Sequence, residues 1–299
     1  HEKFPEWAPF FACVEQTRRG ARIAHELADK GLLKCAVVNV AESWAKLERE
    51  SPMIGQSVVT EVVRKLDRFE AAGLPRPKEA TVIGYGAVGE AVTKALMARG
   101  ITVHVYDTRP EVLAKLPPGV VGHSDKAEAL KHGGVTVSCV GERTLFPDDY
   151  EHLPDGAMLV NAASADDELG PQDLLRFTKG NLAIDAHGEG WTVFQGRPIS
   201  VGHPEAHAHS DTVVKLESGK ELLLASNGFV VNMTGERDPI PPRYIQLTRA
   251  LLLMGAITAT RAREPGLIEV PEEWQHALVA HIEHQLSTSG ESLQKPLWD

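Results

Sequence analysis

The sequence predicts an α/β fold whose main part is a doubly wound parallel sheet. Apolar, β-branched runs alternate with helical stretches from residue 80 to about residue 187, and a glycine-rich turn links the first run to its helix. A shorter strand–helix–strand pattern occupies residues 10–40. Strands that alternate with helices of this length imply right-handed crossovers and therefore parallel pairing. A second, smaller α/β part is expected before the main sheet.

The N-terminal part is expected to form a strand, a helix and a strand. The segments are "FFACVE" at 10–15, "TRRGARIAHELADKG" at 17–31 and "LLKCAVVNV" at 32–40, whose end is a β-branched run suited to a buried parallel strand. Residues 57–73 carry valines and a leucine at helical spacing, which predicts a helix that ends before "LPRP".

The central part alternates strands with helices. The predicted strands share short apolar runs and cover 80–84, 102–107, 135–141, 157–163 and 182–188. The predicted helices between them cover 89–100, 109–116, 124–133 and 170–177. Short strands then follow at 191–202, 211–226 and 229–235, with "ESGK" as a hairpin turn. Two helices are expected at the end of the chain, over 241–262 and 270–287.

The composition limits the partners. The chain has 299 residues and a net charge of −10 with acids and bases interspersed, so a nucleic-acid partner is not expected. No apolar run approaches the roughly 18 residues of a membrane helix, so no membrane partner is expected either. Cys13, Cys35 and Cys139 lie in apolar segments and are expected to be buried and reduced, which favours a cytoplasmic location. The chain starts at His1 without a signal-peptide pattern, and its native start stays open.

The glycine-rich turn carries the strongest functional signal. Gly84, Gly86 and Gly89 follow a predicted strand and open a predicted helix, which is the context of a dinucleotide-binding loop of the Rossmann type. Asp107 ends the next strand, 18 residues after Gly89, and its carboxylate could accept hydrogen bonds from the adenosine ribose. Asp107 favours NAD over NADP because it would repel a 2′-phosphate, while Arg109 leaves NADP as an alternative. A tight turn without a nucleotide is the less favoured interpretation.

Several further segments resemble one family in order and spacing. "VEQTRRGARIAHELADKGLLKCAVVNV", "PMIGQSVV", "VIGYGAVGEAV", "MLVNAASADDEL" and "GKELLLASNGFVVNMTG" are similar to motifs of the S-adenosylhomocysteine hydrolases, from about residue 12 to 260. The resemblance implies that Thr17, Val88, Asp107, Asn161 and Asn232 contact NAD, with Asn161 and Asn232 at the nicotinamide ribose and carboxamide. The full expected cofactor-binding set is Thr17, Gly84, Gly86, Ala87, Val88, Gly89, Asp107, Arg109, Gly141, Asn161 and Asn232.

The chain also departs from that family where the family's chemistry takes place. Leucine and serine stand where the family has a lysine and an aspartate before the hinge, and a glutamine replaces a glutamate. A carboxamide cannot act as a general base and a leucine carries no proton, so the hydrolase activity is not expected. The departing positions are Gln16, Ala41, Leu47, Ser51, Ser164 and Asp238.

Two other groups of residues were weighed as catalytic or ligand-binding. His203, His207, His209 and Asp211 lie in "GHPEAHAHSD", which the family lacks. A solvated loop is favoured there over a metal site or a catalytic imidazole, so no metal site is assigned and His207 is a weak catalytic candidate. Glu168 matches an acidic family position and is a candidate proton acceptor, with an exposed charge as the alternative.

Arg18 and Arg19 replace hydroxyl side chains of the family at the start of a helix. An anionic substrate is one interpretation of this pair, and a solvated helix end is the other.

These observations predict a Rossmann-type sheet with a small β-hairpin insertion and an additional partial α/β domain. The expected parts are a remnant of a substrate-type domain with a hinge over 1–55, an NAD-binding domain over 56–240 with the hairpin insertion at about 188–226, and helices over 241–299 that return to the first part.

The expected function is that of an NAD-dependent oxidoreductase, or an oxidoreduction-assisted lyase, on a small polar substrate that is nucleoside- or sugar-like. The alternative is a non-catalytic NAD-binding regulator. A homo-oligomer, most simply a dimer, is expected.

Overall fold

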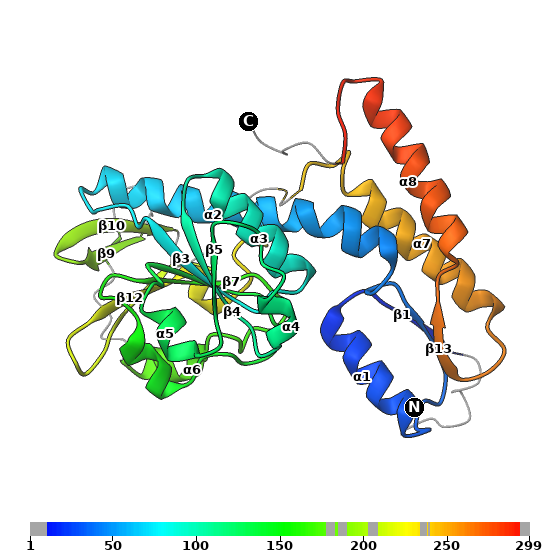
Figure 1. The fold of residues 1–299 in the computed structure, drawn as a ribbon, viewed down its shortest axis with the longest axis horizontal. Helices are drawn as coiled ribbons and strands as arrows, with labels where there is room; N and C mark the ends of the chain where they lie inside the picture. The colour runs from blue at the N-terminus through cyan, green and yellow to red at the C-terminus, as the bar shows by residue number, and fades with distance from the viewer. Residues whose placement is uncertain are drawn as a thin grey trace. The chain divides into compact units, whose positions relative to one another are not determined.

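The computed structural model describes residues 11–177, 183–184, 190–202, 209–233, 238 and 240–293. It forms two compact units (Figure 1). The first contains the residues up to Met53 together with those from Ile240 onward, and the second contains Ile54–Pro239. The boundary falls within helix α2 (Ser51–Ala71).

The first unit is built on a three-stranded parallel sheet in the order β1-β2-β13. Its strands are β1 (Ala12–Glu15), β2 (Ala36–Asn39) and β13 (Gly266–Glu269), and its helices are α1 (Arg18–Asp29), α7 (Gln246–Arg261) and α8 (Glu272–Ser287). A π-helical turn, Lys46–Glu50, leads into α2. The third strand was not predicted, because four residues between two long helices are too few to show a period.

Helix α7 approaches this sheet closely at Gly255. A Cβ atom at that position would lie 2.7 Å from Val14 Cγ1 and 2.8 Å from Val40 Cγ2. Glycine therefore lets the helix pack directly on Val14 of β1 and on Val40, which follows β2.

The second unit contains a seven-stranded sheet in the order β11-β12-β7-β6-β3-β4-β5. All neighbouring pairs are parallel except the edge pair of β11 and β12. The strands are β3 (Glu79–Ile83), β4 (Thr102–Tyr106), β5 (Val120–His123), β6 (Val135–Ser138), β7 (Met158–Asn161), β11 (Thr212–Lys215) and β12 (Glu221–Leu224). The chain reverses its direction across the sheet between β3 and β6, which confirms the doubly wound fold and locates the crevice where such folds bind ligands.

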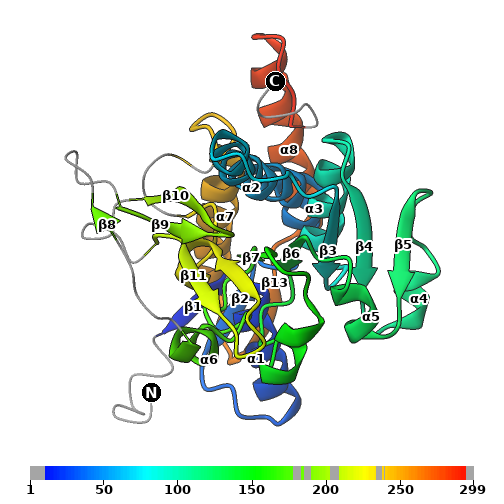
Figure 2. The ribbon, with the colours of Figure 1, turned by 90° about the vertical axis from the view of Figure 1, so that its left-hand side faces the viewer.

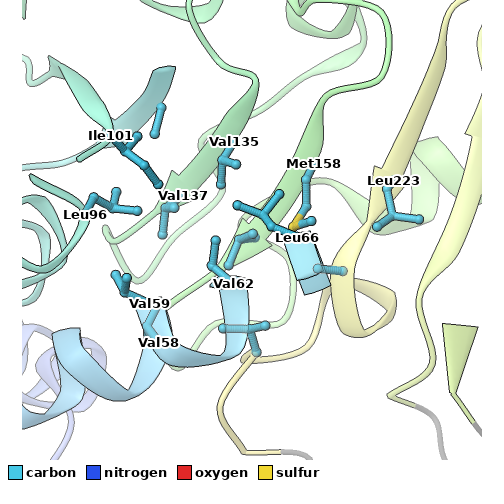
Figure 3. Packing of buried hydrophobic residues seen from close by; sticks show 14 of the residues in the cluster. Val58, Val59, Val62, Leu66, Leu96, Ile101, Val135, Val137, Met158 and Leu223 are labelled. Atoms are coloured by element: carbon cyan, nitrogen blue, oxygen red, sulfur yellow. The ribbon is translucent and has the colours of Figure 1, made fainter. Parts of the chain in front are cut away.

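Alternate residues of the strands separate the two faces of this sheet. Val82, Val105 and Val137 face α2 and α3 (Ala87–Ala98), and Figure 3 shows α2 side chains such as Val62 and Leu66 against this layer. The opposite face is covered by α5 (Lys126–Leu130), a 3₁₀ turn (Pro147–His152) and α6 (Pro171–Leu174). Figure 1 shows these two sets of helices on opposite sides of the sheet.

The second face is more polar than the first. Thr81, His104, Thr136 and Ser138 are all buried there. The Thr81 hydroxyl donates to the carbonyl of Ala129 at 2.7 Å, and the Ser138 and Thr144 hydroxyls are 2.9 Å apart. Directional bonds thus supplement apolar contacts in holding α5 and its neighbours on this face.

The β-rich segment differs from the predicted hairpin insertion at 188–226. Strands β9 (Gly190–Phe194) and β10 (Arg197–Gly202) form a small antiparallel sheet with β8 (Ala183–Ile184), beside β11 in Figure 2. The hairpin of β11 and β12 instead extends the main sheet. Of the strand predicted at 182–188, the described residues Ala183–Ile184 pair with β9 outside the main sheet. Of the one predicted at 229–235, the described residues 229–233 form one bridge, between Val230 and Asn161.

The three cysteines are free thiols. Cys13 is exposed and Cys35 and Cys139 are only partly buried, so the expectation that all three are buried was wrong. None of the helices in the described ranges combines the length and hydropathy that crossing a membrane requires.

A buried ion pair joins α2 to the start of β11. The Lys65 ammonium contacts the Asp211 carboxylate, and both residues are less than a tenth exposed. The same carboxylate accepts the Ser226 N–H at 2.8 Å. Removing one charge of such a pair leaves the other buried without a counter-ion.

We expect Asp211→Ala to lower the free energy of unfolding by about 3–5 kcal/mol, because Lys65 keeps its buried charge. The control is Glu90→Ala, which breaks the exposed Lys94–Glu90 pair and should cost less than about 1 kcal/mol. Urea denaturation followed by circular dichroism measures both. Equal costs for the two variants would contradict the structural role of the buried pair.

Candidate functional site

The turn between β3 and α3 is shaped by its glycines. Gly84 has a φ of +85°, a conformation that favours glycine, and its N–H donates to the Tyr106 carbonyl at 2.8 Å. A Cβ at Gly89 would lie 1.9 Å from the Gly84 carbonyl oxygen. Helix α3 can therefore begin directly against the end of β3 only with glycine at this position.

Gly86 faces open space at the start of the same helix. It is the N-cap of α3, and a Cβ placed on it would meet no heavy atom of the described chain within 4 Å. The N–H groups of Ala87 and Val88 lie in the first turn of α3, where backbone donors have no acceptor within the helix. An uncapped helix start beside an open glycine is suited to bind the phosphates of a nucleotide.

Asp107 lies next to this turn and is tied to it. Its carboxylate accepts the Tyr85 N–H at 2.8 Å, and Arg109 donates to it from its N–H and its guanidinium at 2.8–3.0 Å. Burial alone would raise the pKa of Asp107, but the hydrogen bonds from Arg109 and Tyr85 outweigh it and lower this pKa to about 2. The carboxylate is therefore ionised at neutral pH, while Arg109 offsets part of its charge.

Glu168 is fully buried, so the alternative of an exposed charge was wrong. Its carboxylate accepts the N–H groups of Val140 and Gly141, in the loop that follows β6. Burial raises the pKa of Glu168, and hydrogen bonds from Ser138, Gly141 and Val140 offset only part of that effect. The residue supports the loop that contains Gly141, and its role as a proton acceptor stays a prediction.

The side-chain amide of Asn161 is hydrogen-bonded to backbone groups of the chain. Its Nδ2 donates to the carbonyls of Ala165 and Gly228 at 2.7 and 3.0 Å, and its Oδ1 accepts the Ala163 N–H at 2.9 Å. Both donor hydrogens are thus occupied at the end of β7. Asn161 joins two loops at this strand end, which is the carboxyl edge of the sheet.

Asn232 differs from Asn161 in having a free acceptor. Its Nδ2 donates to the Ser57 hydroxyl at 3.1 Å, but its buried Oδ1 has no hydrogen-bond partner among the described residues. Leaving a buried carbonyl oxygen unpaired costs about 1–3 kcal/mol. The oxygen is therefore available to a donor from a ligand.

Thr17 belongs to the first unit, whereas the other predicted cofactor contacts belong to the second. Its hydroxyl donates to Glu15 at 2.8 Å and accepts the Gly20 N–H at 3.0 Å, as the N-cap of α1. Arg18 pairs with Glu42 at 2.7 Å, which reduces the positive charge expected to attract an anion.

The histidine segment lies mostly outside the described residues, because His203 and His207 fall at 203–208. His209 packs edge-on against Phe229, with ring centroids 4.8 Å apart. Asp211 is bound to Lys65 and does not share a metal-like cluster with His209 in the described part of the chain.

Sequence analysis missed two polar side chains that complete this region. Ser57 is buried in α2 beside Asn232, and Ser138 ends β6 beside Glu168. A serine at the end of an apolar strand was a usable signal, since such ends face the crevice. Ser57 could not be identified from the sequence in this way, because it lies in a helix among apolar residues.

The chain is similar to several curated proteins. An adenosylhomocysteinase of Thermococcus kodakarensis is 24% identical over 279 residues, which cover 91% of this chain and 58% of that protein. The S-inosyl-L-homocysteine hydrolase of Methanococcus maripaludis is 29% identical over 210 residues, covering 64% of this chain and 48% of that protein. The chain thus spans about half the length of these relatives. No protein-family model matches it.

Among solved structures, the D-lactate dehydrogenase of Lactobacillus jensenii with NAD+ is similar with a TM-score of 0.38 and 17% identity, covering 58% of this chain and 63% of that chain.

We expect Gly89→Ala to destabilise the second unit by about 3 kcal/mol or more, since the methyl group would overlap the Gly84 carbonyl. The matched control is Gly86→Ala, which places the same methyl group in open space and should cost about 1 kcal/mol or less. Urea denaturation compares the two. A Gly89→Ala variant as stable as Gly86→Ala would contradict the close packing of α3 on β3.

Proposed function

We propose that this chain, a divergent member of the adenosylhomocysteinase family, binds NAD in its second unit and oxidises or reduces a small polar substrate. The observation that carries the proposal is the turn at Gly84–Gly89, where one glycine permits close packing and another leaves open space at a helix start. The family resemblance supports NAD as the dinucleotide. Bound NAD would supply hydride transfer.

The unpartnered oxygen of Asn232 supports the nicotinamide end of the same assignment. The Asn232 Oδ1 is a buried acceptor without a donor among the described residues. The N–H₂ group of the nicotinamide carboxamide could donate a hydrogen bond to it. Asp107 would hold the adenosine ribose, with its ionised carboxylate favouring NAD over NADP. Arg109 weakens that preference because its guanidinium is bound to the same carboxylate.

A non-catalytic NAD-binding regulator is the second candidate, and Asn161 favours it. The donors of its amide are already bonded to the chain, so it would hold the fold instead of the nicotinamide. The replacements Gln16, Leu47 and Ser51 favour the same candidate, because none of these side chains moves a proton as the family's residues do.

Titration calorimetry tests cofactor binding. We expect the wild-type chain to bind NAD at least about tenfold more tightly than NADP. Arg109→Ala should increase this preference by removing the guanidinium that a 2′-phosphate would contact.

Gly86→Ala should weaken NAD binding by about 1–3 kcal/mol, because its methyl group would occupy the space for the pyrophosphate. Unchanged NAD binding by a folded Gly86→Ala variant would refute the proposed cofactor site.

Variants of Asn232 and Asn161 distinguish the two candidate functions, an oxidoreductase and a non-catalytic regulator. We expect Asn232→Ala to weaken NAD by about 1–2 kcal/mol and ADP-ribose less, since only NAD has the carboxamide. Asn161→Ala should lower stability and affect both ligands alike. Oxidoreductase activity is sought by nicotinamide absorbance with nucleosides and sugar acids, and thiol release from S-adenosylhomocysteine is expected to be absent. Equal losses of NAD and ADP-ribose in Asn232→Ala would favour the regulator.

A further inference from the structure

Three histidines from separate parts of the second unit meet on one face of its sheet. His104 lies in the middle of β4, His123 ends β5 and His132 follows α5. Each offers a ring nitrogen, and these nitrogens lie within 4.8 Å of one another. Glu79, the first residue of β3, completes the group, which we call the histidine cluster.

Strand alternation explains why the cluster forms. Thr81 is the register partner of His104, and Glu79 is two residues before Thr81, so Glu79 and His104 lie on the same face. Val121 is the register partner of His104 on the other side, and His123 is two residues beyond it. The three side chains therefore emerge on the face that α5 covers.

Two of the three rings share a hydrogen bond and two are stacked. His104 Nδ1 and His123 Nε2 are 2.8 Å apart, which requires one ring to donate and the other to accept. The rings of His104 and His132 stack with centroids 3.8 Å apart and planes 2° from parallel.

Glu79 faces the cluster from the side of β3. Its carboxylate oxygens lie 3.3 Å from His132 Nδ1 and 3.9 Å from His104 Nε2. A carboxylate that bonds the second nitrogen of a ligating histidine orients its ring and makes it a better metal ligand. Nitrogen ligands in a tetrahedral zinc site are about 3.3 Å apart, so the His104–His123 pair is already close to that spacing.

We propose that the histidine cluster binds a divalent transition metal of the Zn²⁺ class. The ion takes the place of the proton shared by His104 and His123, and His132 supplies the third nitrogen. His132 is 38% exposed and has room to turn out of its stack toward the ion. Three imidazoles are a donor set that zinc accepts, and Glu79 supports them as an outer hydrogen-bond partner.

The ion would be structural and independent of the dinucleotide. β5 is at the edge of the sheet, where it pairs with β4 among the described strands, so a metal held by His104, His123 and His132 would link this edge to the segment after α5. Metal ligands bound only in the folded state stabilise that state.

The experiment uses the full chain after chelator treatment and dialysis. Calorimetric titration with Zn²⁺ at pH 7.5 should show one site of micromolar affinity or tighter, and a hundredfold excess over Kd should raise Tm by about 5–10 °C. Co²⁺ in the same site should give the intense visible absorption of a tetrahedral ion. No binding by the wild-type chain would overturn the proposal.

Two sets of variants assign the site. His132→Ala and His123→Ala should each weaken Zn²⁺ by about 100-fold or more, since even loss of an outer partner typically costs about 10–100-fold. Glu79→Gln, at an exposed position, should weaken it by about tenfold while the chain stays folded.

The controls are the exposed His152→Ala and the double variant His203→Ala/His207→Ala, which should bind Zn²⁺ as the wild type does. Loss of binding in the double variant, or retention in His132→Ala, would place the metal elsewhere and refute the histidine cluster as its site. NAD affinity measured in parallel keeps this result separate from the proposed cofactor site.

Discussion

The second unit depends on how closely α3 can approach the end of β3. The 1.9 Å that would separate a Gly89 Cβ from the Gly84 carbonyl leaves no room for any side chain. This contact directs the start of α3 toward the crevice between β3 and β6. It also brings the turn close enough to β4 for the Tyr85 N–H to bond Asp107. The site is thus a consequence of backbone packing before any polar side chain contributes.

The polar side chains at the strand ends divide into supporting and available groups. The side chains of Asn161 and Glu168 form hydrogen bonds with the backbone of neighbouring loops. Asn232 retains a buried oxygen that none of the described residues satisfies. Such an imbalance costs stability in the free protein, and proteins commonly retain it where a ligand repairs it. The two asparagines therefore differ in what they leave unbonded, which is the basis for the different roles proposed for them.

Local patterns in the sequence were sufficient for the glycine turn and for strands β3, β4, β6 and β7, because each is encoded within a few consecutive residues, but they missed the edge strand β5 and the pairing of the β11–β12 hairpin with β7. They were insufficient for β13, whose four residues show no period, and for the pairing of β8 with β9, which depends on distant partners. The burial of Glu168 also depends on a loop almost thirty residues away. The histidine cluster was missed for the same reason, although a histidine within "TVHVY" was an unexplained polar residue in an apolar strand.

The short helix α5 illustrates what hydrogen bonds from a sheet can determine. Its five residues are too few to form a stable helix in isolation. The bond from the Thr81 hydroxyl to the Ala129 carbonyl attaches its C-terminal end to strand β3, and a bond from Thr136 to the Gly133 carbonyl fixes the turn that leads from the helix into β6. Because the helix is held by bonds from the sheet and not by its own length, it should keep its helical turn only while the strands beside it are in place. Amide hydrogens of α5 should accordingly exchange with solvent earlier than those of β3.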